Sequence, residues 1–254
     1  MVNEKYHGLG TAPSVIRELF AYGLQQAKVV GKENVFDYSL GNPSIPAPAK
    51  VNETIKKLID TTDSIQLHGY SMAPGFENVR QAIADNLNAR FNCNAKASEL
   101  FMTCGCAPAL VSVAHALTTS PEDEFIAIAP FFPEYNVFFT CAGAKLAVVP
   151  ADTVHFQIDM DALEKTINEH SVAVVINSPN NPSGVVYTEE TLKKIAELLE
   201  RKSKEYGHPI YIVADEPYRE LVYDGVKVTF IPNVYDNTIV CYSWSKSLSL
   251  PGER

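Results

Sequence analysis

Five short runs of mainly apolar residues, spread along the second half of the chain, predict buried β-strands. They occupy residues 125–129, 145–149, 172–176, 210–214 and 238–242. The runs are rich in Val and Ile and do not alternate with polar residues, a pattern typical of strands covered on both faces. Helical patterns lie between several of them, at residues 133–142, 159–168 and 188–206. Strands that alternate with helices are typical of βαβ units, so the sequence predicts an α/β fold with a mostly parallel sheet covered by helices.

The first half of the chain is mainly helical in pattern. Residues 14–31 predict an amphipathic helix that Ser14 opens, and a short strand is expected at residues 35–38. Residues 41–48 contain too many prolines for either regular structure. Further helices are expected at residues 49–60 and 76–91, and another is expected to begin near Cys106.

The composition is that of an ordinary globular protein, since 46% of the 254 residues are hydrophobic and 20% are charged. The 21 basic and 30 acidic residues give a net charge of −9, which argues against binding to nucleic acid or to an anionic membrane. No apolar run is long enough to span a bilayer, and the first residues lack the apolar core of a signal peptide. The five cysteines include no CxxC pair, and Cys104 and Cys106 lack companions at zinc-site spacing. We therefore expect a cytoplasmic protein without a disulfide framework or a metal site.

In parallel α/β sheets, ligands bind outside the carboxyl ends of the strands. The loops to inspect are therefore residues 103–108, 129–135, 177–184, 214–219 and 243–254. Asp215 ends one apolar strand, where a carboxylate is costly to bury unless a cation or a strong donor meets it. A helix cap, a surface ion pair and a metal ligand are alternative roles for it. Residues 177–184 read Asn-Ser-Pro-Asn-Asn-Pro-Ser-Gly, which fits a plain turn and also a rigid side-chain donor at the edge of a ligand.

The stretch from Ser243 to Arg254 is the most informative. Lys246 lies among small hydroxyl residues immediately after a predicted strand, and Arg254 follows eight positions later. Most lysines are simply solvated, but a confined and partly desolvated lysine loses basicity and acts as a Schiff-base nucleophile. The hydroxyls and Arg254 suit a phosphate group. An amine nucleophile beside a phosphate site indicates pyridoxal 5′-phosphate.

Three motifs follow one another in this chain: Asn-Asn-Pro-x-Gly, Asp-Glu-x-Tyr and Ser-x-Ser-Lys-x-x-x-x-Pro-Gly-x-Arg. From about Leu40 to Arg254, the sequence resembles the class I/II aminotransferases, which are fold-type I enzymes that depend on pyridoxal 5′-phosphate. The resemblance implies an N-terminal segment at residues 1–47, with a helix, an arm and a substrate loop. It also implies a three-layer, cofactor-binding large domain at residues 48–254 that is incomplete at its C-terminus. Relatives continue into a small domain that carries an Arg for the substrate α-carboxylate, so the chain is expected to be a fragment.

The same resemblance assigns the catalytic roles. Lys246 would form the Schiff base and move the proton between the amino acid Cα and the cofactor C4′. Asp215 would pair with the pyridine nitrogen, so that the ring accepts the electrons released at Cα. Tyr218 and Asn181 would hydrogen-bond the phenolic oxygen of the cofactor, and Asn181 would also lie beside the substrate.

The remaining cofactor contacts are implied in the same way. The phosphate would lie at the helix opening after Gly105, where the free amides of Cys106 and Ala107 and the helix dipole favour an anion. Many relatives carry a hydroxyl residue at the position of Ala107, so this site has one side-chain donor fewer. Phe132 matches the aromatic residue that stacks on the ring, and Phe131 is the alternative one position away. The cofactor site is completed by Ser243, Ser245 and Arg254.

Tyr70 resembles the tyrosine that reaches the phosphate of the neighbouring subunit, which implies a homodimer with composite sites. Gly41 resembles the small residue beside the substrate carboxylate. Ordinary packing and a plain turn are the alternatives for these two residues.

The activity implied is reversible transfer of an amino group between an L-amino acid and a 2-oxo acid. A pyridoxal-phosphate-dependent C–S β-lyase on the same fold would use every residue assigned above. A non-catalytic, aminotransferase-like binding module is an alternative from a different class of protein.

Overall fold

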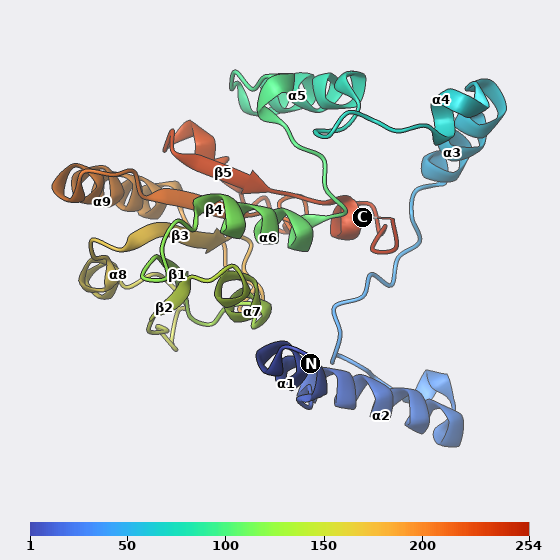
Figure 1. Ribbon diagram of the computed structural model, residues 1–254. Coiled ribbons are helices and arrows are strands. Elements are labelled where there is room, and N and C mark those ends of the chain that lie inside the picture. The colour runs from blue at the N-terminus through green and yellow to red at the C-terminus, as the bar shows by residue number, and fades with distance from the viewer. Residues whose placement is uncertain (254) are drawn as a thin grey trace. The chain divides into compact units, whose positions relative to one another are not determined.

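The computed structural model describes residues 1–253, and within them five strands form one parallel sheet (Figure 1). Its spatial order is β2-β1-β3-β4-β5, and every neighbouring pair is parallel. The strands are β1 (Glu124–Ile128), β2 (Lys145–Val149), β3 (Ser171–Asn177), β4 (Tyr211–Asp215) and β5 (Thr238–Cys241). The predicted α/β fold is confirmed, and the strands differ from their predicted bounds by at most one residue at each end.

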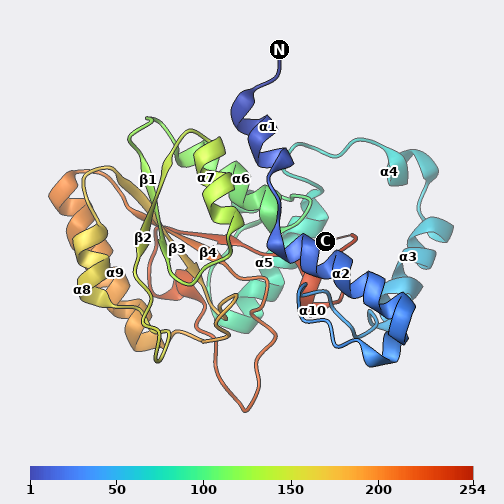
Figure 2. The ribbon, with the colours of Figure 1, turned by 90° about the horizontal axis from the view of Figure 1, so that it is seen from below.

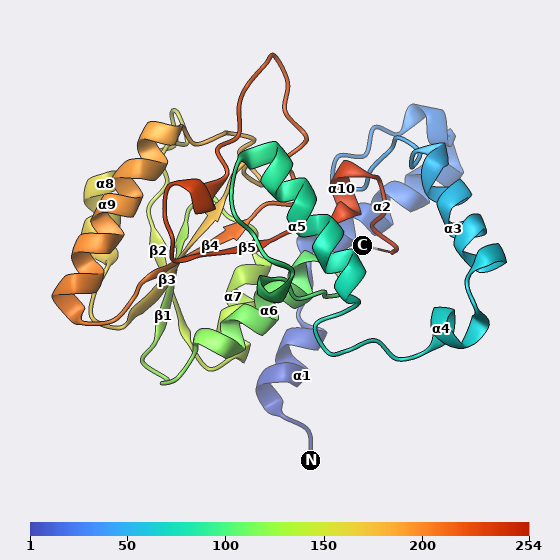
Figure 3. The same cartoon turned by 90° about the horizontal axis from the view of Figure 1, so that it is seen from above.

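Helices cover both faces of this sheet, as Figures 2 and 3 show. The helices α6 (Cys106–Leu117) and α7 (Glu134–Cys141) lie on one face, and α8 (Met160–Thr166) and α9 (Glu189–Tyr206) lie on the other. Successive residues of a strand point to opposite faces. Phe125 therefore packs in the apolar cluster formed with α6 and α7, whereas Ile126 packs in the cluster formed with α8 and α9. Because both faces are buried, the strands read as uninterrupted apolar runs.

Further helical segments precede α6 or flank β5 in the sequence. They are α3 (Ala49–Thr61), α4 (Ser64–His68), α5 (Glu77–Phe91), α10 (Trp244–Ser247) and the 3₁₀ turns Ala97–Glu99 and Ile231–Asn233. Side-chain caps fix several helix starts, since Asp159 accepts a hydrogen bond from the Ala162 amide at α8 and Thr188 accepts one from the Thr191 amide at α9. The sequence predicted α3, α5 and the start of α6, but gave no sign of the single-turn helix α10.

The chain divides into two compact units, Met1–Ile45 and the residues from Pro46 onward. The first contains α1 (Glu4–Thr11), α2 (Val15–Val30) and a 3₁₀ turn at Lys32–Asn34. Ser14 begins α2 as predicted, by accepting a hydrogen bond from the Arg17 amide. The boundary predicted between residues 47 and 48 stays a prediction.

The strand predicted at residues 35–38 is wrong, because that segment has no regular structure. A strand needs a neighbour to satisfy its backbone groups, and the strands described between residues 1 and 253 all lie in the second unit. The Asp37 carboxylate instead accepts a hydrogen bond from the Ser39 amide at 2.8 Å, which closes a local turn.

No helix between residues 1 and 253 combines the length and the apolar character that crossing a membrane requires.

Candidate active site

Three residues form a row across the carboxyl ends of neighbouring strands. Asn177 pairs with Asp215 in the register of β3 and β4, and Asp215 pairs with Cys241 in the register of β4 and β5. The Asn177 side-chain amide donates to the main-chain carbonyl of Asp215 at 2.7 Å. Three of the loops that the sequence singled out, at residues 177–184, 214–219 and 243–254, therefore begin at or just after the carboxyl ends of these adjacent strands.

Asp215 is buried at the centre of this row. Its side chain accepts hydrogen bonds from the Cys106 thiol at 2.8 Å and from the Tyr135 hydroxyl at 2.5 Å. Burial raises the pKa of Asp215, and the bonds from Cys106 and Tyr135 oppose part of that rise. Burial also raises the pKa of the Cys106 thiol. The thiol therefore stays protonated and donates a hydrogen bond to Asp215. The surface ion pair considered for Asp215 is thus wrong, because the residue is only 6% exposed and both of these donors are neutral.

The loop after β3 carries Asn181, whose side chain lies near enough to Tyr218 to affect the pKa of its hydroxyl. Burial and the nearby Asp215 raise the pKa of Tyr218, and the contact with Asn181 opposes the rise. The Asn177 side-chain oxygen accepts a hydrogen bond from the Asn181 main-chain amide at 2.6 Å. Asn177 therefore holds both the Asn181 loop and the end of β4, a role that its turn-like sequence context did not indicate.

Lys246 lies in the single-turn helix α10, which directly follows the end of β5. Its side chain is half-buried, and burial lowers its pKa. Ser243, buried at the start of this turn, donates a hydrogen bond to the Ser245 hydroxyl at 3.1 Å. Arg254, predicted to bind the phosphate, lies outside the described residues.

The turn before α6 requires a glycine. Gly105 has φ 100° and ψ −178°, a backbone conformation that residues with a Cβ very rarely adopt. As the N-cap of α6 it has no side chain to accept the hydrogen bonds of the first-turn amides, which include those of Cys106 and Ala107. This helix end, with its positive dipole, suits an anionic ligand.

Aromatic side chains line the start of α7. Phe132 is half-buried and meets the Tyr135 ring edge-on at 5.8 Å, whereas Phe131 lies parallel to the same ring at 6.1 Å. The choice of Phe132 over Phe131 as the stacking residue stays a prediction. Tyr135 was missed from sequence because a buried aromatic residue on a helix is indistinguishable from ordinary core. The one signal available in the sequence was the Tyr135 hydroxyl itself, because a buried hydroxyl needs a hydrogen-bond partner.

The last two predicted residues, Tyr70 and Gly41, are both exposed. The Tyr70 side chain is fully exposed on the segment between α4 and α5. Gly41 is exposed and belongs to the first unit.

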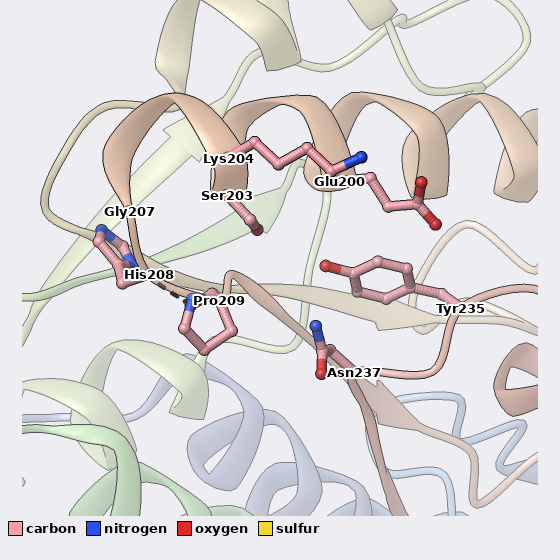
Figure 4. Close-up of a pocket in the computed structure, with 8 residues that line it drawn as sticks. All are labelled: Glu200, Ser203, Lys204, Gly207, His208, Pro209, Tyr235 and Asn237. Carbon is pink, nitrogen blue, oxygen red and sulfur yellow. Dashed lines mark hydrogen bonds between the residues drawn. The ribbon is translucent and has the colours of Figure 1, made fainter.

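A shallow pocket of about 580 Å³ lies at the opposite edge of the sheet, where β4 and β5 begin (Figure 4). Three of the polar side chains that line it have partners within the protein. The Ser203 hydroxyl accepts from the Ile210 amide at 2.9 Å, the Tyr235 hydroxyl donates to the Ile210 carbonyl at 2.6 Å, and His208 Nδ1 lies 3.2 Å from the Pro209 carbonyl. None of the candidate site residues lines it.

Together, the fold and the site define an α/β protein with a buried carboxylate and a half-buried lysine on adjacent strand ends. The model of the aminotransferase class I and II family matches residues 33–254. The chain belongs to this family, whose members depend on pyridoxal 5′-phosphate.

Individual relatives agree with the family match. The crystal structure of an amino transferase from Eubacterium rectale is 61% identical, with a TM-score of 0.97 over 100% of this chain and 64% of that one. Among curated proteins, "Probable N-acetyl-LL-diaminopimelate aminotransferase" of Bacillus subtilis is 31% identical over 94% of this chain and 58% of its own length. Aromatic-amino-acid aminotransferase 2 of Thermococcus litoralis is 29% identical over 95% and 59%. The chain thus spans about three fifths of the length of these curated relatives.

The Asp215 cluster fits the family cofactor. A buried carboxylate whose two side-chain donors are a thiol and a phenol gains from a positively charged partner, and a protonated pyridine nitrogen is such a group. The uncapped start of α6 offers amides to a phosphate.

Proposed function

We propose that the full-length protein is a pyridoxal-phosphate-dependent aminotransferase that exchanges an amino group between an L-amino acid and a 2-oxo acid. The observation that carries this proposal is the buried Asp215, contacted by neutral donors, on the strand next to the one that leads into Lys246. When bound, the cofactor supplies an electron-poor ring that stabilises the negative charge formed at the amino acid Cα.

Each proposed catalytic residue of this protein would have a separate role. Asp215 holds the proton on the ring nitrogen. The Lys246 Nζ would hold the cofactor covalently between turnovers, and during turnover its amine would move the proton to and from the substrate Cα. Its lowered pKa supports this role, because a larger fraction of the amine is unprotonated at neutral pH than for a solvated lysine. Tyr218 and Asn181 donate hydrogen bonds to the phenolic oxygen.

Binding contacts belong to the same proposal. The amides after Gly105, at Cys106 and Ala107, hold the phosphate from one side. Phe132 packs on the ring face. Ser243, Ser245 and Arg254 supply further hydroxyl and cationic contacts to the cofactor.

The substrate side and the assembly are proposed from the family. We propose that Gly41 and Asn181 lie beside the substrate, and that Tyr70 reaches the phosphate of a second copy of the chain in a homodimer. The exposure of Tyr70 supports this, because a large aromatic side chain that its own subunit leaves fully solvated is available to a partner. Because the named substrates of the relatives differ, the proposed substrate class is L-amino acids in general. We also propose that the protein is cytoplasmic.

The deciding experiment is the visible absorption spectrum of the purified full-length protein with pyridoxal 5′-phosphate. We expect a yellow band that bleaches when L-amino acids are added and returns with a 2-oxo acid. Lys246→Ala should abolish the covalent link, which borohydride reduction and mass spectrometry detect, whereas Lys145→Ala, a change at an exposed surface ion pair, should not.

Other outcomes would contradict the proposal in distinct ways. A band that forms without completing this cycle, together with pyruvate and ammonia released from cystathionine, would replace the transferase with a β-lyase. Absence of a band would overturn the enzyme assignment.

A further inference from the structure

A chain of hydrogen bonds joins the loops that follow β4 and β5. The Tyr242 hydroxyl donates to Glu220 Oε2 at 2.9 Å and lies 2.9 Å from the Ser247 hydroxyl. Arg90 of α5 donates to the other oxygen of Glu220 at 3.0 Å, so both oxygens of the Glu220 carboxyl group accept a hydrogen bond. Because the Tyr242 phenol has a single proton, Ser247 must donate to the Tyr242 oxygen. The chain therefore runs in one direction, from Ser247 through Tyr242 to Glu220.

The two ends of this chain lie next to proposed catalytic residues. Ser247 directly follows Lys246 in α10, and Glu220 comes two residues after Tyr218 in the loop that begins with Asp215. A four-residue helix has almost no stability of its own, because its first turn fixes several backbone angles for one hydrogen bond. Contacts outside α10 must therefore hold it in place.

The Tyr242 ring is itself held on two sides. The Arg219 guanidinium lies over it at 4.9 Å, and the Trp244 ring meets it edge-on at 5.9 Å. Arg219 is buried, forms an ion pair with Glu216, and also lies over the Phe91 ring at 5.2 Å. A phenol anchored in this way keeps its hydroxyl at a fixed point between the two loops.

We propose that Tyr242 is a positioning residue that sets the placement of Lys246 relative to Asp215 and Tyr218. It acts through Ser247 and Glu220 and does not touch the reacting atoms. This inference rests on the proposed function, since it assigns Lys246 its task.

The test is Tyr242→Phe in the full-length protein with pyridoxal 5′-phosphate bound. The substitution keeps the ring and its contact with Arg219 but removes both hydroxyl bonds. We expect kcat to fall about tenfold while KM changes less than about twofold. The pH midpoint of the visible absorbance of the lysine-bound cofactor should shift by about half a unit or more, because this midpoint depends on where Lys246 is held.

Tyr235→Phe is the matched control. It removes a buried hydroxyl bond to the Ile210 carbonyl, 2.6 Å long, at the opposite edge of the sheet. It should lower the unfolding temperature but leave kcat and the absorbance midpoint unchanged. Ser247→Ala removes only the bond between Ser247 and Tyr242, so it should change kcat and the absorbance midpoint in the same direction as Tyr242→Phe. The double variant should show no further change from Tyr242→Phe, because that substitution already removes this bond.

The inference is overturned if Tyr242→Phe has the kcat and the absorbance midpoint of the wild type, as Tyr235→Phe is expected to have. If Tyr242→Phe does not fold, Ser247→Ala decides the question by the same two measurements. A wild-type protein without a visible band would overturn the proposed function, and this inference with it. A normal wild-type band with unaltered variants overturns the positioning role alone.

Discussion

Burial sets the proton affinity of the side chains at the carboxyl ends of β4 and β5. Asp215 and Cys106 both have pKa values raised by burial, and each is in contact with the other. Lys246 has its pKa lowered by the same effect. Loss of water disfavours whichever form carries charge, so all three are shifted toward neutrality. A cationic ligand beside Asp215 would lower the pKa of this carboxyl group again. The charged carboxylate would in turn stabilise the bound cation.

The direction of the Lys246 shift gives a prediction for the cofactor-free protein. As pH rises, the amine of Lys246 should become reactive at a lower pH than an ordinary lysine, whose pKa is about 10.4. Trace labelling with acetic anhydride between pH 7 and 11, read by mass spectrometry of the peptide that contains Lys246, measures the midpoint.

A further consequence concerns stability. The folded state binds this proton less tightly than the unfolded chain, so between the two pKa values stability should rise with pH. Lys246→Met should remove this contribution. A labelling midpoint at or above that of a solvated lysine would contradict the burial argument.

At the scale of elements, the candidate functional side chains of the second unit mostly come from strand ends or from the turns that follow them. Asp215 ends β4, Asn181 and Tyr218 lie in the loops after β3 and β4, and Lys246 lies in the turn after β5. The end of a strand fixes where the following loop begins and the direction in which it leaves the sheet. A short loop can therefore place a side chain at the site with few residues. The start of α6 differs, because there the backbone itself is the proposed binding group.

Gly105→Ala tests the backbone at the start of α6. A residue with a Cβ at φ 100°, ψ −178° should lower the free energy of unfolding by about 1–3 kcal/mol. The apparent Kd for pyridoxal 5′-phosphate should rise as well, since relief of strain would rotate the amides that follow. Urea unfolding and absorbance titration measure the two effects.

Gly207→Ala provides the control for this change. Gly207 ends α9 with φ 77° and ψ 18°, and a Cβ there would meet no heavy atom within 4 Å. It should cost about 1 kcal/mol of stability, as for other left-handed helix ends, and leave cofactor affinity unchanged. Equal cofactor affinities in the two variants would argue against a phosphate at the start of α6.

At the scale of the whole molecule, sheet topology gathers residues that are far apart in sequence. Cys106 and Asp215 are separated by 109 positions, and Tyr135 and Asp215 by 80. They meet because β4 is an interior strand of the sheet, between β3 and β5, while α6 and α7 cover one face of the sheet. Tyr70, another candidate residue of this unit, is exposed to solvent.

The proposed composite site can be tested by mixing two impaired variants, Lys246→Ala and Tyr70→Ala. A hybrid dimer would have one site with both changes and one site with neither. Random exchange makes half of the dimers hybrids, so about a quarter of wild-type activity should return at a cofactor concentration that saturates only intact sites. A mixture of Lys246→Ala with Asp215→Ala should recover nothing, because both residues belong to one subunit's site. No recovery in the first mixture would contradict the role given to Tyr70.

Much of the fold could be predicted from local pattern. The five apolar runs gave the strands, and Ser14 gave the start of α2, because periodicity and capping depend on neighbouring residues. The strand expected at residues 35–38 failed for the complementary reason, since a strand exists only where another strand pairs with it. The loop positions of Asp215, Asn181 and Lys246 were also accessible, because polar residues directly after apolar runs are visible in sequence.

Contacts within the site were less accessible. Asn177 looked like one more turn residue, yet it joins two strand ends. Tyr135 looked like core, and Cys106 was singled out for its backbone amide while its thiol binds Asp215. Each of these roles depends on a partner contributed by a different strand or helix.

Local periodicity and residue type are enough to predict the alternation of strands and helices, the parallel α/β class and the chemistry available at each strand end. Which of those groups meet depends on how the strands and helices pack. The strand order places Asp215 between Asn177 and Cys241, the packing of α6 and α7 brings it a thiol and a phenol, and Tyr242 links the loop of Tyr218 to the turn of Lys246. These contacts join residues far apart in the chain, and their energies come from pairing and burial that no local stretch of sequence contains.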